Sequence, residues 1–475
     1  MNLAWTAQRT ATDALHDDAF DAPTGSRGAS ARQGGLPGRR LLWLAALGLP
    51  LAALDGGSGL GLWLVVAYDG LLLLGAWLEA RRLRRCVPRV SRHVLDRLVS
   101  GRDARAELVV HNPHPTLVRV RLRDTPPSEL TVAPAELSLV LPPYGRTRAP
   151  YTLVPTRRGS YTLGDVYLHL EGPLGLGALR VRAPAASPVR VYPDVLGTRG
   201  DELQLRLRDQ QHAGNRQVRQ LGGGGEFAQL REYVAGDPFR DLDWKSTAKR
   251  RRPVTRVLQH ERSQTIVLGL DVGRMMAARM DEHAGRAGLT KLDHALHAAL
   301  MLAWFALRQG DQVGLVIFGA GVSRYVPPGR GAGHYARLLE ASFDVEAQST
   351  FVDFRSLVSF VRTRVRKRAL VVLFSDLLDE EHAMPLAECA AVLRQKHLPL
   401  CVTLEEPLAT RLADAPATNT SEVYARAAAA DLLTDRERVK AHLAKSGVGL
   451  VEASASELAL STVRRYLEIK AKHAL

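Results

Sequence analysis

Two long apolar runs near the start of the chain limit what it can fold into more than any other feature. The first run covers residues 41–54 and the second covers residues 60–78, with a polar, glycine-rich turn between them. The second run has about the length that a helix needs to cross a lipid bilayer, whereas the first must borrow residues at its ends. Aromatic side chains that suit a membrane–water interface accompany the second run: Trp63, Tyr68 and Trp77. We therefore predict two transmembrane helices within residues 41–80, rather than a buried helical hairpin of a soluble protein.

Arginines on both sides of this hairpin predict its orientation. Arg39 and Arg40 precede it, and the connecting turn contains no lysine or arginine. Four more arginines follow it: Arg81, Arg82, Arg84 and Arg85. Because positive residues tend to stay on the cytoplasmic side, both ends of the hairpin are predicted to face the cytoplasm. Residues 1–40 are polar and lack the apolar segment of a signal peptide, so they are predicted to be a disordered tail.

The charge balance indicates anionic partners. The chain has 64 Lys and Arg against 49 Asp and Glu, which leaves a net charge of +15. Such a surplus favours either nucleic acid or the anionic face of a membrane, and the arginines beside the apolar runs explain part of it as lipid-facing charge. Aromatic residues make up 6% of the chain and are not interleaved with the basic runs, which speaks against base stacking. The three cysteines are widely spaced and match no zinc or redox motif.

A β-rich domain is predicted over residues 87–195. Apolar and charged side chains alternate along residues 118–123, which is the pattern of a half-buried antiparallel strand. Further short strands are predicted at residues 106–110, 166–170, 179–182 and 189–192. Turn signals that contain proline or glycine separate these runs. Short strands at this spacing indicate a small β-sandwich.

Strands and helices alternate over residues 263–475. Strands are predicted at residues 265–270, 313–318, 369–374, 398–404 and 448–452, and the first of them is a continuous apolar run, typical of a parallel strand covered on both faces. Helices are predicted between or after them, at residues 291–308, 331–342, 354–364, 421–445 and 456–472. The alternation predicts a Rossmann-like α/β domain with a parallel sheet and right-handed crossovers.

Two carboxylates stand at the ends of strands in this predicted sheet. Asp271 ends the first strand, and Asp376 follows Ser375 directly after the strand at residues 369–374. Ligands of such sheets bind beyond the carboxyl ends of the strands. If these two strands are neighbours, both carboxylates converge on one crevice.

Residues 196–262 form a basic connector that holds the most unusual segment of the chain. Lys245 begins a Lys-Ser-Thr sequence that is similar to the end of a phosphate-binding loop. That motif needs a glycine directly before the lysine, where this chain has Trp244. Nucleotide binding is therefore not predicted here. The four basic residues at 249–252 are interpreted as a solvated or lipid-facing patch.

The segment from Glu226 to Glu261 resembles the signature of the domain-of-unknown-function 58 family. The resemblance is carried by Glu226, Phe227, Leu230, Arg231, Glu232, Tyr233, Gly236, Asp237, Arg240, Asp243, Trp244, Lys245, Thr247, Ala248 and Glu261. The likeness extends in both directions, to the apolar runs and to the C-terminal end of the chain. It implies a membrane-anchored protein with a von Willebrand factor A-like domain, partnered with a MoxR-type AAA+ ATPase and without established catalytic chemistry.

The resemblance also implies where a metal would bind. A von Willebrand factor A domain holds a metal ion at its strand ends, and its first loop reads Asp-x-Ser-x-Ser, whereas this chain has Asp271, Gly273 and Met275. Both hydroxyl ligands are lost, and a thioether sulfur does not suit magnesium. The remaining positions of the site fall on Thr350 or the nearby Asp353 in the second loop and on Asp376 in the third. We therefore expect a vestigial site that binds no metal, and no cofactor.

The predicted function is that of a non-catalytic adaptor or assembly factor in the bacterial inner membrane, with its soluble domains in the cytoplasm. It would act with a MoxR-type AAA+ ATPase through its von Willebrand factor A-like domain, and anionic membrane lipid is the second expected partner. The sequence contains no GxSxG or HExxH motif, and no GxGxxG after a strand, so an enzyme is not predicted. The alternative is a basic, membrane-associated protein that binds nucleic acid. A metal-dependent hydrolase would need Asp271 and Asp376 to hold a cation that activates water.

Overall fold

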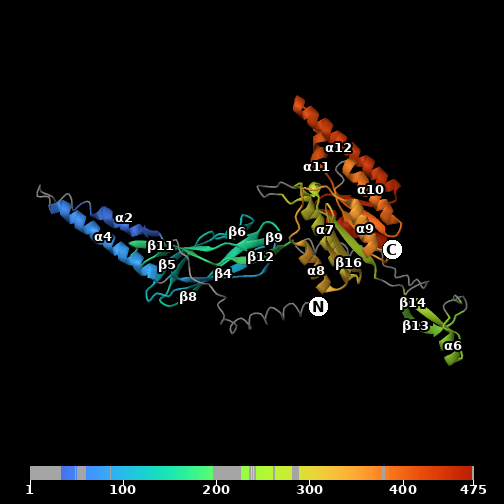
Figure 1. Ribbon diagram of the computed structural model, residues 1–475, viewed down its shortest axis with the longest axis horizontal. Coiled ribbons are helices and arrows are strands. Elements are labelled where there is room, and N and C mark those ends of the chain that lie inside the picture. The colour runs from blue at the N-terminus through green and yellow to red at the C-terminus, as the bar shows by residue number, and fades with distance from the viewer. Residues whose placement is uncertain are drawn as a thin grey trace. The chain divides into compact units, whose positions relative to one another are not determined.

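A computed structural model describes residues 34–48, 50, 60–85, 87–195, 226–234, 237, 239, 242–259, 263–280, 288–376 and 380–472. Contacts within the chain divide it into two units, Met1–Tyr192 and Pro193–Leu475. Figure 1 labels many of the helices and strands of both units.

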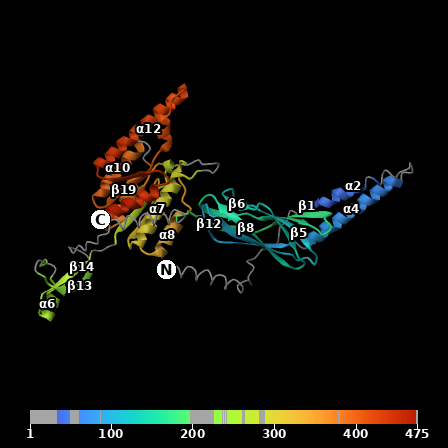
Figure 2. The same cartoon turned by 180° about the vertical axis from the view of Figure 1, so that it is seen from behind.

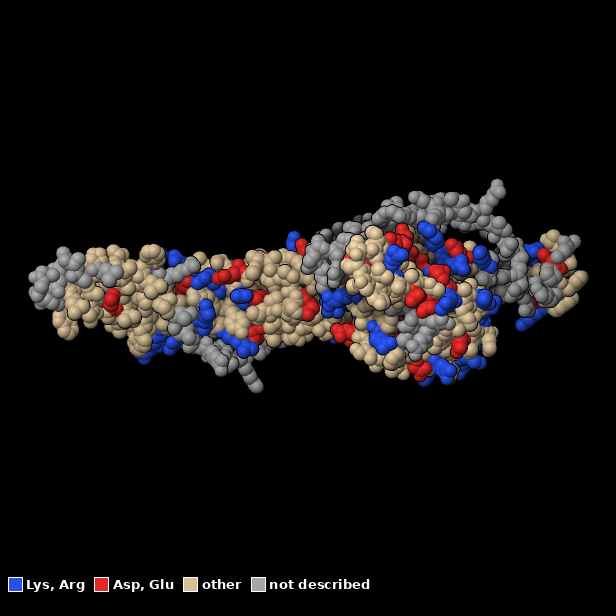
Figure 3. Space-filling view, turned by 90° about the horizontal axis from the view of Figure 1, so that it is seen from above, with Lys and Arg blue, Asp and Glu red and all other residues tan. Residues whose placement is uncertain are grey.

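Two apolar helices begin the first unit. Helix α2 spans Arg39–Leu47 and helix α4 spans Leu60–Arg85. They touch one another, since the Tyr68 hydroxyl donates a hydrogen bond of 3.0 Å to the carbonyl oxygen of Leu44. In Figure 3 the surface of this helical part is nearly free of charged side chains.

Only α4, among the residues that the structure describes, is long and apolar enough to cross a membrane. The predicted first span at residues 41–54 is not confirmed, because α2 has nine residues and a helix of that length covers about 14 Å. Residues 49 and 51–59, where the rest of that predicted span lies, are outside the described part of the chain. One candidate transmembrane helix is therefore what the structure supports.

Three β-sheets make up the rest of what the structure describes in the first unit. The five-stranded sheet has the order β1 (Gly34–Pro37), β11 (Gly177–Ala183), β10 (Val166–Glu171), β5 (Val118–Asp124) and β7 (Leu137–Leu141). The four-stranded sheet has the order β2 (Arg89–Val94), β4 (Ala104–His111), β8 (Arg146–Pro155) and β6 (Leu130–Ala133). The three-stranded sheet has the order β3 (Arg97–Val99), β12 (Ser187–Tyr192) and β9 (Gly159–Leu163). The predicted β-rich region is confirmed.

One apolar core joins these sheets. Along β5 the side chains of Val118, Val120 and Leu122 are buried, while Arg119 and Arg123 are exposed. The same core cluster contains residues from all three sheets. Alternating burial along a strand is what an antiparallel sheet with one covered face requires. The alternation of apolar and charged residues in the sequence therefore identifies correctly which side chains of β5 face the core.

A six-stranded sheet organises the second unit. Its order is β17 (Val322–Gly329), β16 (Gln312–Phe318), β15 (Thr265–Asp271), β18 (Leu370–Phe374), β19 (Leu398–Leu404) and β20 (Gly449–Ala453). All pairs are parallel except the edge pair of β17 with β16. The predicted α/β region with parallel strands is confirmed.

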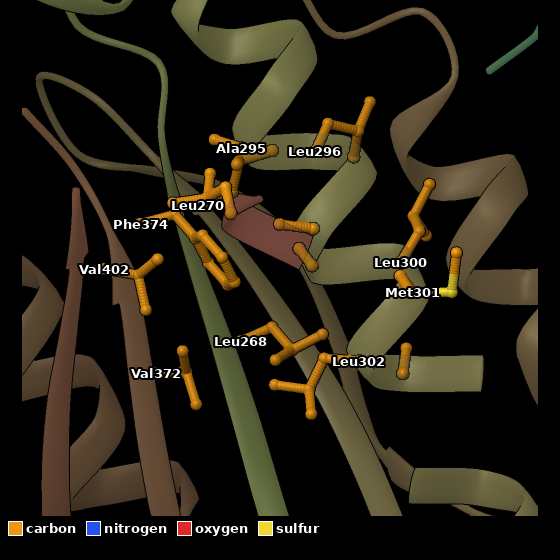
Figure 4. Close-up of a cluster of buried hydrophobic side chains, with 14 of the residues drawn as sticks. Leu268, Leu270, Ala295, Leu296, Leu300, Met301, Leu302, Val372, Phe374 and Val402 are labelled. Atoms are coloured by element: carbon orange, nitrogen blue, oxygen red, sulfur yellow. The ribbon is translucent and has the colours of Figure 1, made fainter. Parts of the chain in front are cut away.

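Helices cover both faces of this sheet, as Figures 1 and 2 show from opposite sides. One core cluster joins the sheet to α7 (Lys291–Arg308), α8 (Ala332–Ser342) and α13 (Leu458–Ala471). The other joins it to α9 (Phe354–Arg364), α10 (Glu380–Arg394) and α12 (Thr420–Lys445). Figure 4 shows the first cluster, in which Leu268 and Leu270 of β15 meet the apolar side of α7. Since both faces are covered, the inner strands β15, β16, β18 and β19 are buried at nearly every position.

The strand order places a topological switch point between β15 and β18. The chain leaves β15 toward β16 on one side, and later returns to β18 on the other side. Loops that follow two such strands diverge, which opens a crevice at the carboxyl ends of the strands. This is the place where the sequence predicts that Asp271 and Asp376 converge.

The signature segment forms a small unit of structure of its own. Strand β13 (Glu226–Glu232) pairs antiparallel with β14 (Val254–Gln259), and the short helix α6 (Trp244–Arg250) lies between them in sequence. Asp243 begins α6, because its side chain accepts a hydrogen bond of 2.9 Å from the amide of Ser246.

Candidate functional site

The carboxyl ends of β15 and β18 bring two carboxylates and a hydroxyl together. Strands β15 and β18 are paired neighbours. Asp271 is buried, and its two carboxylate oxygens accept hydrogen bonds from the Ser375 hydroxyl (2.5 Å) and from the Gly273 amide (2.7 Å). Asp376 is also buried beside them. The predicted convergence of Asp271 and Asp376 at one crevice thus follows from the strand pairing.

A lysine occupies the centre of this crevice. Lys291 is the first residue of α7, and its side chain is almost fully buried. Its ammonium group lies 2.7 Å from Asp376 Oδ2 and 2.6 Å from Glu406 Oε2. Burial of a carboxylate is costly unless a cation or several hydrogen-bond donors lie beside it, and Lys291 is the partner of this kind for Asp376.

An arginine completes the charge network. Arg436 of α12 is buried, and its Nε lies 2.8 Å from Glu452 Oε1. Its Nη1 lies 3.8 Å from Asp376 Oδ1, and its Nη2 donates to the carbonyl oxygen of Leu404. Lys440, one turn further along α12, lies 2.5 Å from the other oxygen of Glu452. The network therefore holds four carboxylates, of which Asp271 is the one without a direct cation, and three cations.

The electrostatics of the network differ from one carboxylate to the next. Burial raises the pKa of Asp271 to about 6, and the nearby charge of Asp376 acts in the same direction, while the two hydrogen bonds to Asp271 oppose the rise. For Glu452, burial alone would raise the pKa. Hydrogen bonds from Lys440 and Arg436 outweigh burial and hold the pKa of Glu452 below its usual value.

The cavity at this place is small. Its volume is about 10 Å³, which is about the space that a single water molecule needs. The residues that line it are Met276, Lys291, Ala295, Ser375, Asp376, Val402, Thr403, Leu404 and Leu458. A small-molecule substrate would need a pocket many times larger.

The residues present do not fit the magnesium ion that the resemblance implies. A magnesium ion needs about six oxygen ligands in a near-octahedral shell, whereas Oδ2 of Asp376 already accepts a hydrogen bond from the ammonium of Lys291. Gly273 has no room for the missing serine, because a Cβ there would lie 2.4 Å from Cγ2 of Val352. Among the residues that the structure describes, no group of three His, Cys, Asp or Glu side chains could hold a metal ion.

The other predicted positions of the vestigial site have structural roles or stand at its edge. The carbonyl oxygen of Thr350 accepts a hydrogen bond from the amide of Arg274, so this residue does lie against the first loop. Asp353 instead caps α9, since its side chain accepts from the amide of Ser356 at 3.0 Å. Met275 lies in the short 3-10 helix Arg274–Ala277 that follows Gly273.

The rim of the crevice carries an exposed aromatic side chain. Phe351 follows Thr350 and is exposed, and the guanidinium carbon of Arg274 lies 4.1 Å from the centre of its ring. An arginine stacked on an aromatic ring is held in place by a cation–π interaction. The rim therefore presents a preformed pair of the two residue types that most often anchor protein interfaces.

The signature residues fall into two groups. Some hold the segment together: Arg231 pairs with Asp237 at 2.7 Å, Asp237 accepts from the amide of Val234, Glu232 pairs with Arg252, and Asp243 caps α6. Others point to solvent, with Trp244 exposed by 68% and Phe239 by 74%, and Lys245 exposed as well. Tyr233 is partly buried and its ring lies 6.0 Å from that of Phe239. Gly236 and Arg240, and the side chains of Glu226 and Phe227, lie outside the described residues.

Comparison with known proteins relates much of the second unit to a family. Residues 229–445 match the model of a family described as protein of unknown function DUF58. This part of the chain, less than half of its length, is similar to the DUF58 family. The match begins in β13 of the signature and ends at the last residue of α12, so it includes Asp271, Lys291, Asp376 and Arg436.

Curated relatives agree with this assignment. An uncharacterized protein of Mycobacterium bovis is 28% identical over 196 residues, which is 41% of this chain and 59% of that protein. An uncharacterized protein of Mycobacterium tuberculosis matches with the same identity and the same coverage. The chain thus spans 59% of the length of the curated relatives that it matches.

Solved structures add little. The CARDB domain of a Pyrococcus furiosus protein, solved in complex with di-metal ions, is 14% identical and covers 22% of this chain and 88% of that chain, with a TM-score of 0.16. A FixG-related protein from Vibrio parahaemolyticus is 11% identical and covers 22% of this chain and 95% of that chain, with a TM-score of 0.17. Similarity at this level supports no inference about function.

The sequence analysis did not identify Lys291, Arg436, Glu406 or Glu452 as members of the site. A signal for the first was present. Lys291 is in phase with the buried stripe of α7, whose next members are Ala295, Ala298 and Leu302, and a cation in the first helical turn opposes the helix dipole. A lysine in that position indicates an anionic partner in the core.

Proposed function

We propose that the chain is a membrane-anchored binding protein that acts with a MoxR-type AAA+ ATPase and performs no covalent chemistry. The observation that carries this proposal is the state of the strand-end crevice. Its cavity has room for about one water molecule, and Asp376, Glu406 and Glu452 are each paired with a cation of the chain itself. A site that is filled and neutralised in this way favours binding at the rim over catalysis inside.

Residues 263–475 are proposed to form the von Willebrand factor A-like domain of this protein. The six-stranded sheet with one antiparallel edge strand and helices on both faces supports the assignment. So does the position of Asp271 and Asp376 at the two strand ends of the switch point.

The membrane anchor is proposed to be a hairpin of two helices in the bacterial inner membrane. Helix α4 supplies the second span, and α2, which packs on it through the bond from Tyr68 to Leu44, begins the first. Arginines flank both outer ends, so the soluble domains would lie in the cytoplasm beside anionic lipid headgroups: Arg39, Arg40, Arg81, Arg82, Arg84 and Arg85.

This topology makes a direct prediction. A reporter enzyme that is active only in the periplasm, fused after Leu475, is expected to give no signal, whereas a reporter that is active only in the cytoplasm is expected to give a full one. The reason is the excess of arginine on the proposed cytoplasmic side. A strong periplasmic signal would overturn the orientation and exclude a cytoplasmic ATPase as partner.

The partner surface is proposed to include the rim of the crevice and the exposed aromatics of the signature. Arg274 stacked on Phe351 forms the rim contact, and Trp244 with Phe239 forms the signature contact. Aromatic and arginine side chains contribute most of the binding energy in many interfaces, often 2 kcal/mol or more each, on the order of a 30-fold change in affinity.

We expect full-length protein in detergent to retain a co-encoded AAA+ ATPase in a pull-down, and Arg274→Glu or Trp244→Ala to weaken retention by about tenfold or more. Arg308→Glu is the matched control, because Arg308 is also stacked on an aromatic ring, Trp304, but stands at the far end of α7 from the crevice. Circular dichroism checks the fold of each variant. If the wild type retains no ATPase but binds DNA or RNA in a salt-sensitive way, the nucleic-acid alternative replaces this proposal.

A further inference from the structure

The C-terminal end of α4 is clamped to the β domain by one carboxylate. Glu79 is buried, and its Oε1 accepts a hydrogen bond of 2.8 Å from the amide of Leu174. Its Oε2 accepts two more, each of 2.8 Å, from the amides of Leu176 and Gly177. All three donors belong to the turn that joins β10 to β11, or to the first residue of β11. A carboxylate that accepts three amide hydrogen bonds fixes both groups that it joins.

Glycines let this turn approach the helix closely. A Cβ at Gly177 would lie 2.5 Å from the carbonyl oxygen of Ala76, and a Cβ at Gly172 would lie 2.1 Å from Glu79 Oε1. Leu176 is nearly buried, and its Cδ1 lies within van der Waals reach of the Gly75 position. The turn is therefore seated on the last two turns of the apolar part of α4.

The contact between the turn and α4 lies at the level where α4 would leave the membrane. The apolar run ends at Leu78, and Arg81 follows with its guanidinium carbon 5.1 Å from the centre of the Trp77 ring. Tryptophan and arginine side chains mark the headgroup layer of a bilayer. The turn, which contacts residues 75–79 of α4, stands at this layer.

We propose that the turn at residues 172–176 contacts the lipid headgroup layer, with Leu174 as its apolar anchor and Glu79 as the residue that positions it. This rests on the proposed membrane anchor. Leu174 is 62% exposed at the tip of the turn, and a single exposed leucine would need no explanation elsewhere on the surface. Here it belongs to the turn that packs against residues 75–79 of α4, where Leu73, Leu74 and Trp77 are exposed as well, so a lipid bilayer that covers this end of α4 is expected to reach Leu174. The β domain would then contact the membrane at two places, through helix α4 and through Leu174.

The test uses a fluorescent label that reports a lipid environment. It is attached to a cysteine that replaces one of three leucines of similar exposure: Leu174 in the turn, Leu71 on α4 (68% exposed) or Leu95 after β2 (66% exposed). Leu95 is the aqueous control, because β2 leads away from α4 and carries it about 20 Å from the helix end. The full chain, with Cys86 and Cys389 replaced by serine, is reconstituted into phosphatidylcholine vesicles that contain phosphatidylglycerol.

We expect a blue-shifted, brighter emission from labels at positions 71 and 174, and an unshifted emission from a label at position 95. A shifted signal at position 71 with an unshifted one at position 174 overturns the proposal and leaves the membrane anchor intact. An unshifted signal at position 71 overturns the anchor itself, and the present proposal with it.

The role of Glu79 is tested with the same label at position 174. Glu79→Ala removes the acceptor of three hydrogen bonds, so the label is expected to lose its lipid-type emission. Glu171→Ala is the control, since Glu171 ends β10 in the same hairpin but pairs with Arg121 at 2.8 Å instead of with α4. A label that stays in a lipid environment in Glu79→Ala, with the label at position 71 also unchanged, contradicts the positioning role of Glu79.

Discussion

Replacing Lys291 with alanine is expected to destabilise the α/β part of the protein by about 3–5 kcal/mol, because it leaves buried carboxylates without their cation. The lysine lies 2.7 Å from Asp376 and 2.6 Å from Glu406, and its side chain is 3% exposed. Lys291→Met keeps the length of the side chain but not the charge, so a similar loss is expected from it. Amide hydrogen exchange of β15 and β18 in the full chain measures the loss.

The same substitution is expected to create a response to magnesium that the wild type lacks. Without Lys291, Asp376 and Glu406 offer hard oxygen ligands close to Asp271, and carboxylate oxygens are the ligands that magnesium prefers. Millimolar magnesium is therefore expected to restore part of the lost exchange protection in Lys291→Ala. In the wild type the ammonium takes the place of the ion, so magnesium is expected to have no effect.

Lys440→Ala is the matched control for this experiment. Lys440 belongs to the same charge network, but it is 22% exposed and Glu452 keeps Arg436 as a second partner. Its removal is expected to cost about 1 kcal/mol or less and to create no response to magnesium. Equal stabilisation of wild type and Lys291→Ala by magnesium would show that Lys291 does not take the place of a metal ion.

Local signals explain why the sequence predicts several elements of the second unit to the residue. Helix α7 begins where Thr290 and Asp293 form a capping box, in which each side chain accepts from the other's amide. Strand β19 is a continuous apolar run, which coincides with its observed bounds. Such signals depend on neighbours within a few residues, so they can be read without the fold.

Elements whose stability depends on distant partners were missed. Strand β17 was not predicted. It contains Pro327 and Pro328 and lies at the edge of the sheet, where missing amide donors are tolerated. The first apolar run was interpreted as a membrane span, yet its described helix ends at Leu47. Hydropathy alone does not report where a helix stops.

The candidate site divides in the same way. Asp271 and Asp376 could be found because each follows an apolar strand, and strand ends are where ligands of such sheets bind. The cations that pair with Asp376 could not be predicted, because they are distant in sequence. Lys291 lies 85 positions before Asp376, and Arg436 belongs to α12. The missing serines predict a vestigial metal site. That Lys291 contacts Asp376 is visible only in the structure.

Asp271→Asn is expected to stabilise the protein at neutral pH, with an effect that depends on pH. The native pKa of Asp271 is raised from 3.8 to about 6, chiefly by burial. Between these values the native state holds a proton that the unfolded state has released, so stability falls as the pH rises through this window. Since one pKa unit corresponds to about 1.4 kcal/mol, the cost of the charged form is on the order of 3 kcal/mol above about pH 6.

Asparagine removes this cost while keeping both hydrogen bonds. Its amide oxygen can accept from the amide of Gly273, and its amide nitrogen can donate to the Ser375 hydroxyl oxygen, where the carboxylate accepts at 2.7 and 2.5 Å. Hydrogen exchange of β15 and β18, corrected for the intrinsic rate at each pH, is expected to show greater protection in the variant at neutral pH. The advantage is expected to shrink as the pH falls below about 6 and to vanish well below pH 3.8, where Asp271 is protonated in both states. Asp353→Asn is the control, because Asp353 is an exposed helix cap and asparagine caps equally well. An advantage of Asp271→Asn that does not change with pH would mean that the pKa of Asp271 is the same in the native and the unfolded state, and would contradict this prediction.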